Sequence, residues 1–287
     1  MDFYTTLDSA ISALAGALWG TPLVILLLGG GVFFASYSRL TPILYFKHGI
    51  DIGTDEFYTK LLNGSELPKT SQPSPGEFLD VYNKFLDESD AIVSIHVTSK
   101  LSGTYNSAIQ AKSELEATKP IEVVDSATVS MALGLIVIRA AKIAKNGGTL
   151  DQVLKEIEDC LSKSEVLVVL DTLEYLEKGG RIGKARALIG SILSLKPILT
   201  VADGIVDTFG KARTFTKAMN SLEEAIKGFT PVTDVSVFYS TDKDISDDML
   251  DRLSGIVEPD RLVVSRIGPT VGTYAGPKAI AVAVIKE

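Results

Sequence analysis

The sequence SIHVTSKLSGTYNSA, residues 94–108, constrains the fold more than any other part of the chain. An apolar run that ends near Val97 predicts a buried strand, and Tyr105 and Ala108 follow at helical spacing. Between them lies a turn rich in hydroxyl groups around Gly103. In α/β folds, ligands bind where a strand's carboxyl end meets such a turn, and the N–H groups at the helix start favour an anion. We therefore expect this turn to hold a carboxylate or phosphate, although Ser and Thr are also ordinary helix caps.

Length and composition narrow the class of protein. The chain has 287 residues, enough for two domains, and strand patterns alternate with helical ones from about residue 50, which predicts an α/β fold with helices packed on β-sheets. A net charge of -8 argues against a nucleic-acid partner, because that partner requires a basic surface. The single Cys160 excludes an intrachain disulfide and fits a reducing compartment. His48 and His96 are the only histidines in the sequence, too few with one cysteine to form a zinc site, so we expect none. The sequence also indicates no cofactor.

The first 50 residues differ from the rest. Residues 14–35 are apolar apart from Thr21, and the segment is long enough to cross a bilayer as a helix. The glycines at 29–31 favour a membrane helix over a buried core helix. A cleaved signal peptide fits less well, because the start is acidic. Arg39 and Lys47 follow the span. The positive-inside rule then predicts a membrane anchor with the α/β body in the cytoplasm.

The segments ALWGTPLVILLLGGGVFF and RLTPILYF, within residues 1–48, resemble the first membrane helix of sodium:alanine symporters. A symporter needs many spans to build its binding site, and this chain offers one. The resemblance therefore leaves an alternative function, that of a membrane transporter fragment or a non-functional fusion remnant.

Polar groups stand on predicted loops at four places: Thr70 with Ser71, residues 99–104, Arg181, and residues 272–274. None supplies an obvious base or nucleophile. His96 lies within a strand, where a structural role is favoured, and the serine of SGT lacks a nucleophile elbow. Arg181 follows a glycine pair that ends a helix, and this local pattern predicts a solvated surface residue. The residues thus indicate a protein that binds a small acid, and we do not expect an enzyme.

A set of motifs spans residues 50–287. It comprises DIGTDEFYTKL, TSQPSPGEF, IHVTSKLSGTYNSA, VVDSATVSMALG, LEYLEKGGRIGKA, LKPILTVADGIV, GKART and IGPTVGTYAGPKA. Together they resemble the DegV family of bacterial fatty-acid-binding proteins. The resemblance implies two α/β domains, here 50–163 and 164–287, with a long-chain fatty acid bound between them. Some members present the acyl chain to a separate fatty acid kinase.

The resemblance also implies the site. Thr70 of TSQPS and Ser102 of SGT would hydrogen-bond the ligand carboxylate, with Ser99 and Gly103 as close neighbours. Arg181 of GGRIG falls where family members carry an arginine near the head group.

Two departures from the family pattern concern the kinase and the sheet. Members that serve the kinase often carry a histidine where this chain has Tyr274, whose hydroxyl donates a hydrogen bond without a charge. The opening strands with a TDS motif are replaced by the symporter-like segment 1–49. We therefore expect the first domain to lack its first strands, and its sheet to be weaker than that of 164–287.

Overall fold

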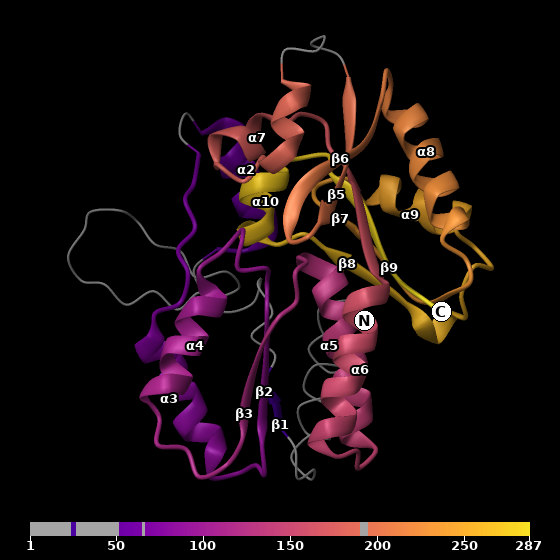
Figure 1. Ribbon diagram of the computed structural model, residues 1–287. Helices are drawn as coiled ribbons and strands as arrows, with labels where there is room; N and C mark the ends of the chain where they lie inside the picture. Colours follow the sequence, from indigo (N-terminus) through magenta and orange to yellow (C-terminus); the bar gives the residue numbers. More distant parts are fainter. Residues whose placement is uncertain (1–23, 27–51, 65–66, 190–194) are drawn as a thin grey trace.

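The computed structural model describes residues 24–26, 52–64, 67–189 and 195–287, and shows an α/β fold built on two sheets (Figure 1). The first sheet is parallel, in the order β1-β2-β3. Its strands are Val24–Leu26 (β1), Ile92–His96 (β2) and Ile121–Asp125 (β3). The predicted α/β class is confirmed.

Helices cover both faces of the first sheet (Figure 1). On one face α3 (Pro75–Leu86) and α4 (Thr104–Glu114) pack on Ile92 and Ile121. On the other lie α5 (Ser130–Lys145) and, packed beside it, α6 (Leu150–Lys163). Helices α3 and α6 begin at capping boxes that are visible in the sequence, Ser74 with Glu77 and Thr149 with Gln152.

Strand β1 corrects our expectation for the N-terminal segment. Residues 24–26 lie inside the predicted membrane helix 14–35, yet they pair in parallel with Ile92, Val93 and Ser94 of β2. A continuous helix over 14–35 is therefore wrong, and the remainder of that span lies outside the described residues. The physical reason is the edge of β2, whose N–H and C=O groups need partners that an aliphatic segment can supply as a strand. Among the residues that the structure describes, no helix has the length and apolar character to cross a membrane.

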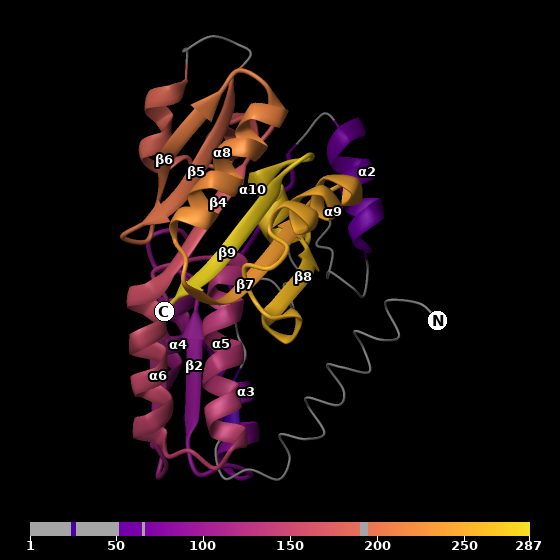
Figure 2. The same cartoon turned by 90° about the vertical axis from the view of Figure 1, so that its right-hand side faces the viewer.

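The second sheet is mixed, in the order β6-β5-β4-β9-β7-β8. Strands β7 and β8 run parallel, and the other neighbours are antiparallel. The strands are Ser164–Val169 (β4), Lys196–Ala202 (β5), Ile205–Ala212 (β6), Val232–Tyr239 (β7), Leu262–Arg266 (β8) and Ile280–Lys286 (β9). Helices α8 (Phe215–Gly228) and α9 (Lys243–Arg252) cover its outer face (Figure 2).

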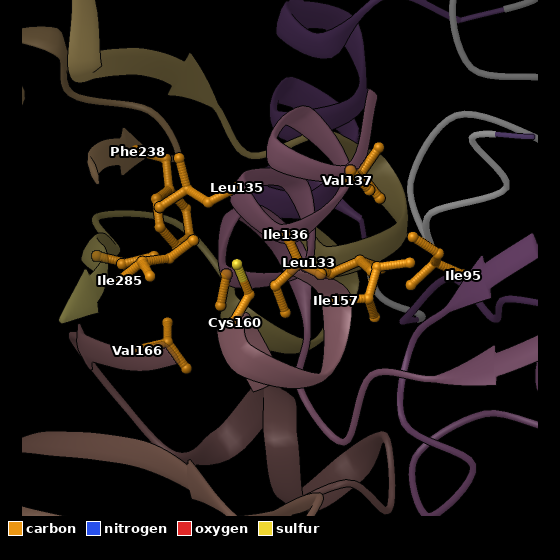
Figure 3. Packing of buried hydrophobic residues seen from close by; sticks show 14 of the residues in the cluster. Ile95, Leu133, Leu135, Ile136, Val137, Ile157, Cys160, Val166, Phe238 and Ile285 are labelled. Atoms are coloured by element: carbon orange, nitrogen blue, oxygen red, sulfur yellow. The ribbon is translucent and has the colours of Figure 1, made fainter. Parts of the chain in front are cut away.

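The α5–α6 pair joins the two sheets into one core. Figure 3 shows Leu133, Ile136 and Ile157 between Ile95 of β2 and the second-sheet residue Ile285. The guanidinium of Arg139 adds polar links, since it bonds Glu156 on α6 and Asp234 on β7 at 2.5 and 2.9 Å.

Five further helical segments belong to the described chain. They are α2 (Thr54–Asn63), α7 (Glu174–Lys178), α10 (Pro269–Ala275) and the 3-10 turns Gly183–Leu188 (η1) and Pro259–Arg261 (η2). Although α2 precedes the first sheet in sequence, it packs on α10 of the other half, where the Tyr58 hydroxyl donates to the Ile267 carbonyl at 2.9 Å. The domain boundaries at 50 and 163 stay predictions, because this helix crosses between the halves.

Candidate functional site

A cavity of about 440 Å³ lies between the two halves of the chain. Its apolar wall comes from the inner face of the second sheet, with Val97 and Leu101 of the first half opposite. The second-sheet residues and their neighbours in this wall are Val166, Val168, Leu170, Leu199, Val201, Val206, Phe238 and Ala281. The volume and the apolar lining are those of a small-molecule site.

Four of the six predicted site residues line this cavity: Thr70, Ser102, Arg181 and Tyr274. Three of them, Thr70, Arg181 and Tyr274, also belong to one contact network. The Thr70 and Tyr274 hydroxyls lie 2.5 Å apart, and the Arg181 guanidinium stacks over the Tyr274 ring at 5.0 Å. The fold therefore brings Thr70 on a loop and Tyr274 on α10, 204 positions apart in sequence, to one part of the cavity. The predicted loop at 272–274 is wrong, because these residues belong to that helix.

Arg181 is held in place by backbone carbonyls. Its Nε donates to the Leu101 carbonyl at 3.2 Å and a terminal nitrogen donates to the Gly179 carbonyl at 2.9 Å. These bonds tie the guanidinium to the residue before Ser102. The reading of Arg181 as a solvated surface residue is thus wrong, because the glycine pair turns the chain inward and the side chain lines the cavity.

The Ser102 turn serves the helix as well as the cavity. The Ser102 hydroxyl lies 2.8 Å from that of Thr104 and accepts the Thr104 N–H at 3.3 Å, at the start of α4. The Ser102 N–H donates to the Thr98 carbonyl at 3.2 Å. Both interpretations of this turn, helix start and cavity lining, therefore apply to the same residue.

Ser99 and Gly103 lie outside the cavity lining. The Ser99 N–H donates to the Asp125 carboxylate at 3.1 Å, which fixes the turn from the neighbouring strand. At Gly103, a Cβ atom would stand 1.9 Å from the Gln72 side-chain oxygen. A larger residue there would therefore push aside the flexible end of the Gln72 side chain, whose amide donates to the Ser107 hydroxyl at 3.1 Å.

Gln72 and Asp125 support the Ser102 turn, and neither was predicted as a site residue. Asp125 accepts the N–H groups of Ser99 and Ala127, so its carboxylate links the Ser99 turn to the end of β3. Its position at the carboxyl end of strand β3 was the available signal. No sequence pattern indicates a role for Gln72, because that role depends on its hydrogen bond to Ser107 on α4, 35 residues further along the chain.

Titratable groups that could act as bases lie elsewhere. His96 is fully buried beneath α3, where its Nε2 lies 2.7 Å from the Ser94 hydroxyl, and Tyr82 donates to that hydroxyl at 2.9 Å. Burial raises the pKa of Tyr82 to about 12 and that of Cys160 to about 12, which keeps both protonated near pH 7. The described residues that line the cavity include no His, Cys, Asp or Glu.

The comparisons with known proteins agree with this fold. The family model described as "Uncharacterised protein, DegV family" matches residues 44–287. A DegV domain-containing protein of Caldanaerobacter subterraneus is 33% identical over 241 residues, covering 83% of this chain and 85% of that protein.

Two solved structures are similar over most of their length. A fatty-acid-binding DegV family protein of Thermus thermophilus has a TM-score of 0.77 and 32% identity, over 83% of this chain and 86% of that one. A stearic-acid-binding protein of Eubacterium ventriosum has a TM-score of 0.76 and 27% identity, over 85% and 87%. The resemblance of residues 1–48 to a symporter stays a prediction. The family match over residues 44–287, with the relative of 33% identity, shows that this chain belongs to the DegV family.

Proposed function

We propose that this chain binds a long-chain fatty acid without transforming it. The observation that carries the proposal is the cavity, whose apolar wall runs to one network of hydroxyl groups and an arginine. Such a space suits a ligand with one anionic end and a long apolar tail. Similar DegV structures described as fatty-acid-binding support the same ligand class.

Each of two hydroxyl pairs can leave one hydrogen for the ligand. When Tyr274 donates to Thr70, the Thr70 hydrogen is left for a carboxylate, and when Thr104 donates to Ser102, the Ser102 hydrogen is left in the same way. Arg181 adds a positive charge beside Tyr274. We therefore assign the carboxylate to Thr70 and Ser102, with Arg181 and Tyr274 as neighbours.

The tail supplies most of the affinity. Each buried methylene contributes about 0.8 kcal/mol, so a sixteen-carbon chain gains far more from the apolar wall than from two hydroxyls. The hydroxyls fix which end of the ligand faces the turn. A chemical step would need a general base near Ser102, and the described cavity lining supplies none.

We extend the proposal to presentation of the bound acid to a kinase. Ser71 and Gln72 line the cavity beside Thr70 and are exposed, so a second protein could reach the carboxylate end from this side. Tyr274, in place of a histidine, offers that partner a hydroxyl and no charge. The alternative of a transporter fragment has less support, because residues 24–26 of its segment form strand β1.

Mass spectrometry of the protein purified under native conditions tests the ligand. We expect a co-purifying fatty acid, and the proposal fails if none is found and added palmitate does not bind. Ser102→Ala and Thr70→Val should each weaken palmitate binding by about 10-fold or more, the scale of a hydrogen bond to a charged group. Ser113→Ala is the matched control, because it removes an exposed hydroxyl on α4, the helix that follows the Ser102 turn. This variant should bind palmitate as the wild type does.

A further inference from the structure

The tip of the β5–β6 hairpin rests on the turn that carries Ser102. The Thr98 hydroxyl donates to the Gly204 carbonyl at 3.1 Å, and the Lys100 ammonium donates to the Asp203 carbonyl at 2.6 Å. Thr98 is 1% exposed, so its bond is shielded from water. These two contacts join the first half of the chain to the second beside residues Val97 and Leu101, which line the cavity.

The hairpin tip is shaped for this contact. Asp203 and Gly204 both have positive φ, +51° and +75°, as in the tight two-residue turns that suit a twisted hairpin. A Cβ atom on Gly204 would lie 2.3 Å from the Thr98 hydroxyl oxygen. The backbone of the tip therefore approaches Thr98 more closely than a side chain at position 204 would permit beside the Thr98 hydroxyl.

The same hairpin forms one wall of the cavity. Leu199 and Val201 on β5 and Val206 on β6 line it. In the described part of the sheet β6 is an edge strand, hydrogen-bonded to β5 alone, so the hairpin has a neighbouring strand on one side only. Movement of its tip away from Thr98 would open the wall beside the proposed tail position.

Thr98 also organises the carboxylate turn. Its carbonyl accepts the N–H groups of Leu101 and Ser102 at 3.1 and 3.2 Å, while its hydroxyl holds Gly204. One buried residue thus contacts the hairpin tip through its side chain and the Ser102 turn through its backbone.

We propose that Thr98 is a positioning residue that latches the β5–β6 hairpin onto the Ser102 turn, and that a ligand enters and leaves when this latch opens. The inference rests on the proposed function, since it concerns exchange of the same fatty acid. The latch determines the rates at which the ligand binds and leaves. The equilibrium affinity is determined by the burial of the tail and by the carboxylate contacts.

A reversible cross-link tests the latch. A Cβ on residue 204 would lie 3.4 Å from the Cβ of Thr98, close to the separation of about 3.5–4.5 Å in disulfides, so Thr98→Cys with Gly204→Cys can form one. The native Cys160 is buried and does not compete. The probe is the fluorescent fatty acid cis-parinaric acid in stopped-flow mixing. We expect association and dissociation to be at least about 10-fold slower in the oxidised protein than in the same protein after reduction, and equal rates would overturn the proposal.

Single variants give a second, ligand-independent measurement. Thr98→Val keeps the shape and removes the hydroxyl, and Thr98→Ser keeps the hydroxyl. Thr98→Val should speed hydrogen exchange of the backbone amides in 201–206 by about fivefold, the factor expected for one hydrogen bond, and should raise both rate constants of the probe with little change in Kd. Thr98→Ser should restore wild-type values.

The two proposals fail in different ways. If wild-type protein binds the probe but Thr98→Val leaves both rate constants and the amide exchange unchanged, the latch is refuted while fatty acid binding stands. If wild-type protein binds no fatty acid, the proposed function is refuted together with the role of the latch in ligand exchange. Amide exchange in Thr98→Val then decides whether the contact holds the hairpin at all.

Discussion

Ala281 is the position where one substitution should shorten the acids that this chain binds. It lies on β9 in the apolar wall, opposite Phe238 on β7 and Val168 on β4, and it is 1% exposed. Ala281→Leu places three more carbon atoms in the cavity. If these displace about three methylenes of the tail at about 0.8 kcal/mol each, palmitate loses about 2.4 kcal/mol, or about 50-fold in affinity.

The assay is competition of saturated fatty acids, from ten to eighteen carbons, against bound cis-parinaric acid. We expect the preferred length to fall by about three carbons in Ala281→Leu, with shorter acids bound as in the wild type. A uniform loss at every length, or no loss for palmitate, would refute the placement of the tail beside Ala281.

Ala283→Leu is the matched control for this experiment. Ala283 lies two residues further along the same strand face but packs in the core and not in the cavity lining. The larger side chain should lower the free energy of unfolding by about 1–3 kcal/mol through overpacking. It should leave the preferred acid length unchanged, which separates occupation of the cavity from general damage to the sheet.

Three further predictions concern the supports of the site and the core. Gly103→Ala should weaken palmitate binding measured by titration, because the new methyl group displaces Gln72 from the turn, and Gln72→Ala in the same chain should recover part of the loss. Arg139→Met should lower the free energy of unfolding in urea by about 2 kcal/mol or more, because it leaves the buried Asp234 carboxylate without its closest cation. Burial raises the pKa of Cys160 from 9.0 to about 12, so its contribution to stability is complete below pH 9 and falls above it by about 1.4 kcal/mol per pH unit. Urea unfolding of Cys160→Ala should therefore show a weaker decline than the wild type between pH 9 and 11.

Local patterns predicted the elements well. The turn around Gly103 begins a helix, as predicted. The capping boxes that start α3 and α6, and the Asp-Gly pair at 203–204 that turns a hairpin, are likewise patterns visible in the sequence. Each of these signals involves residues within a few positions of one another, so local propensity and backbone geometry decide them.

The position of the hairpin tip could not be predicted in this way. Thr98 and Gly204 are 106 residues apart in sequence, and no sequence pattern near either residue predicts that they are in contact. The same holds for Thr70 and Tyr274. Their roles came from the family resemblance, whereas the residues alone indicated only polar groups on loops.

Strand β1 shows where an apolar pattern was ambiguous. The run at 24–26 is aliphatic and has no polar alternation, so its sequence fits a buried strand as well as a membrane helix. The helix prediction considered residues 14–35 alone, whereas in the structure residues 24–26 pair with the edge of β2. The decision between helix and strand thus depended on a partner about 68 residues away, which no window of local periodicity includes.

That pairing bears on the proposed function through the Ser102 turn. Strand β2 ends at His96, two residues before Thr98, so its position sets where the latch and the Ser102 turn lie. In the described chain β2 is held by β1 on one side, β3 on the other, and α3 and α5 on its two faces. Three of these four supports come from the family-like part of the chain, and β1 comes from the segment that differs from the family pattern. Because a central strand is held more firmly than an edge strand, this short segment helps to fix the turn on which both carboxylate binding and the hairpin latch depend.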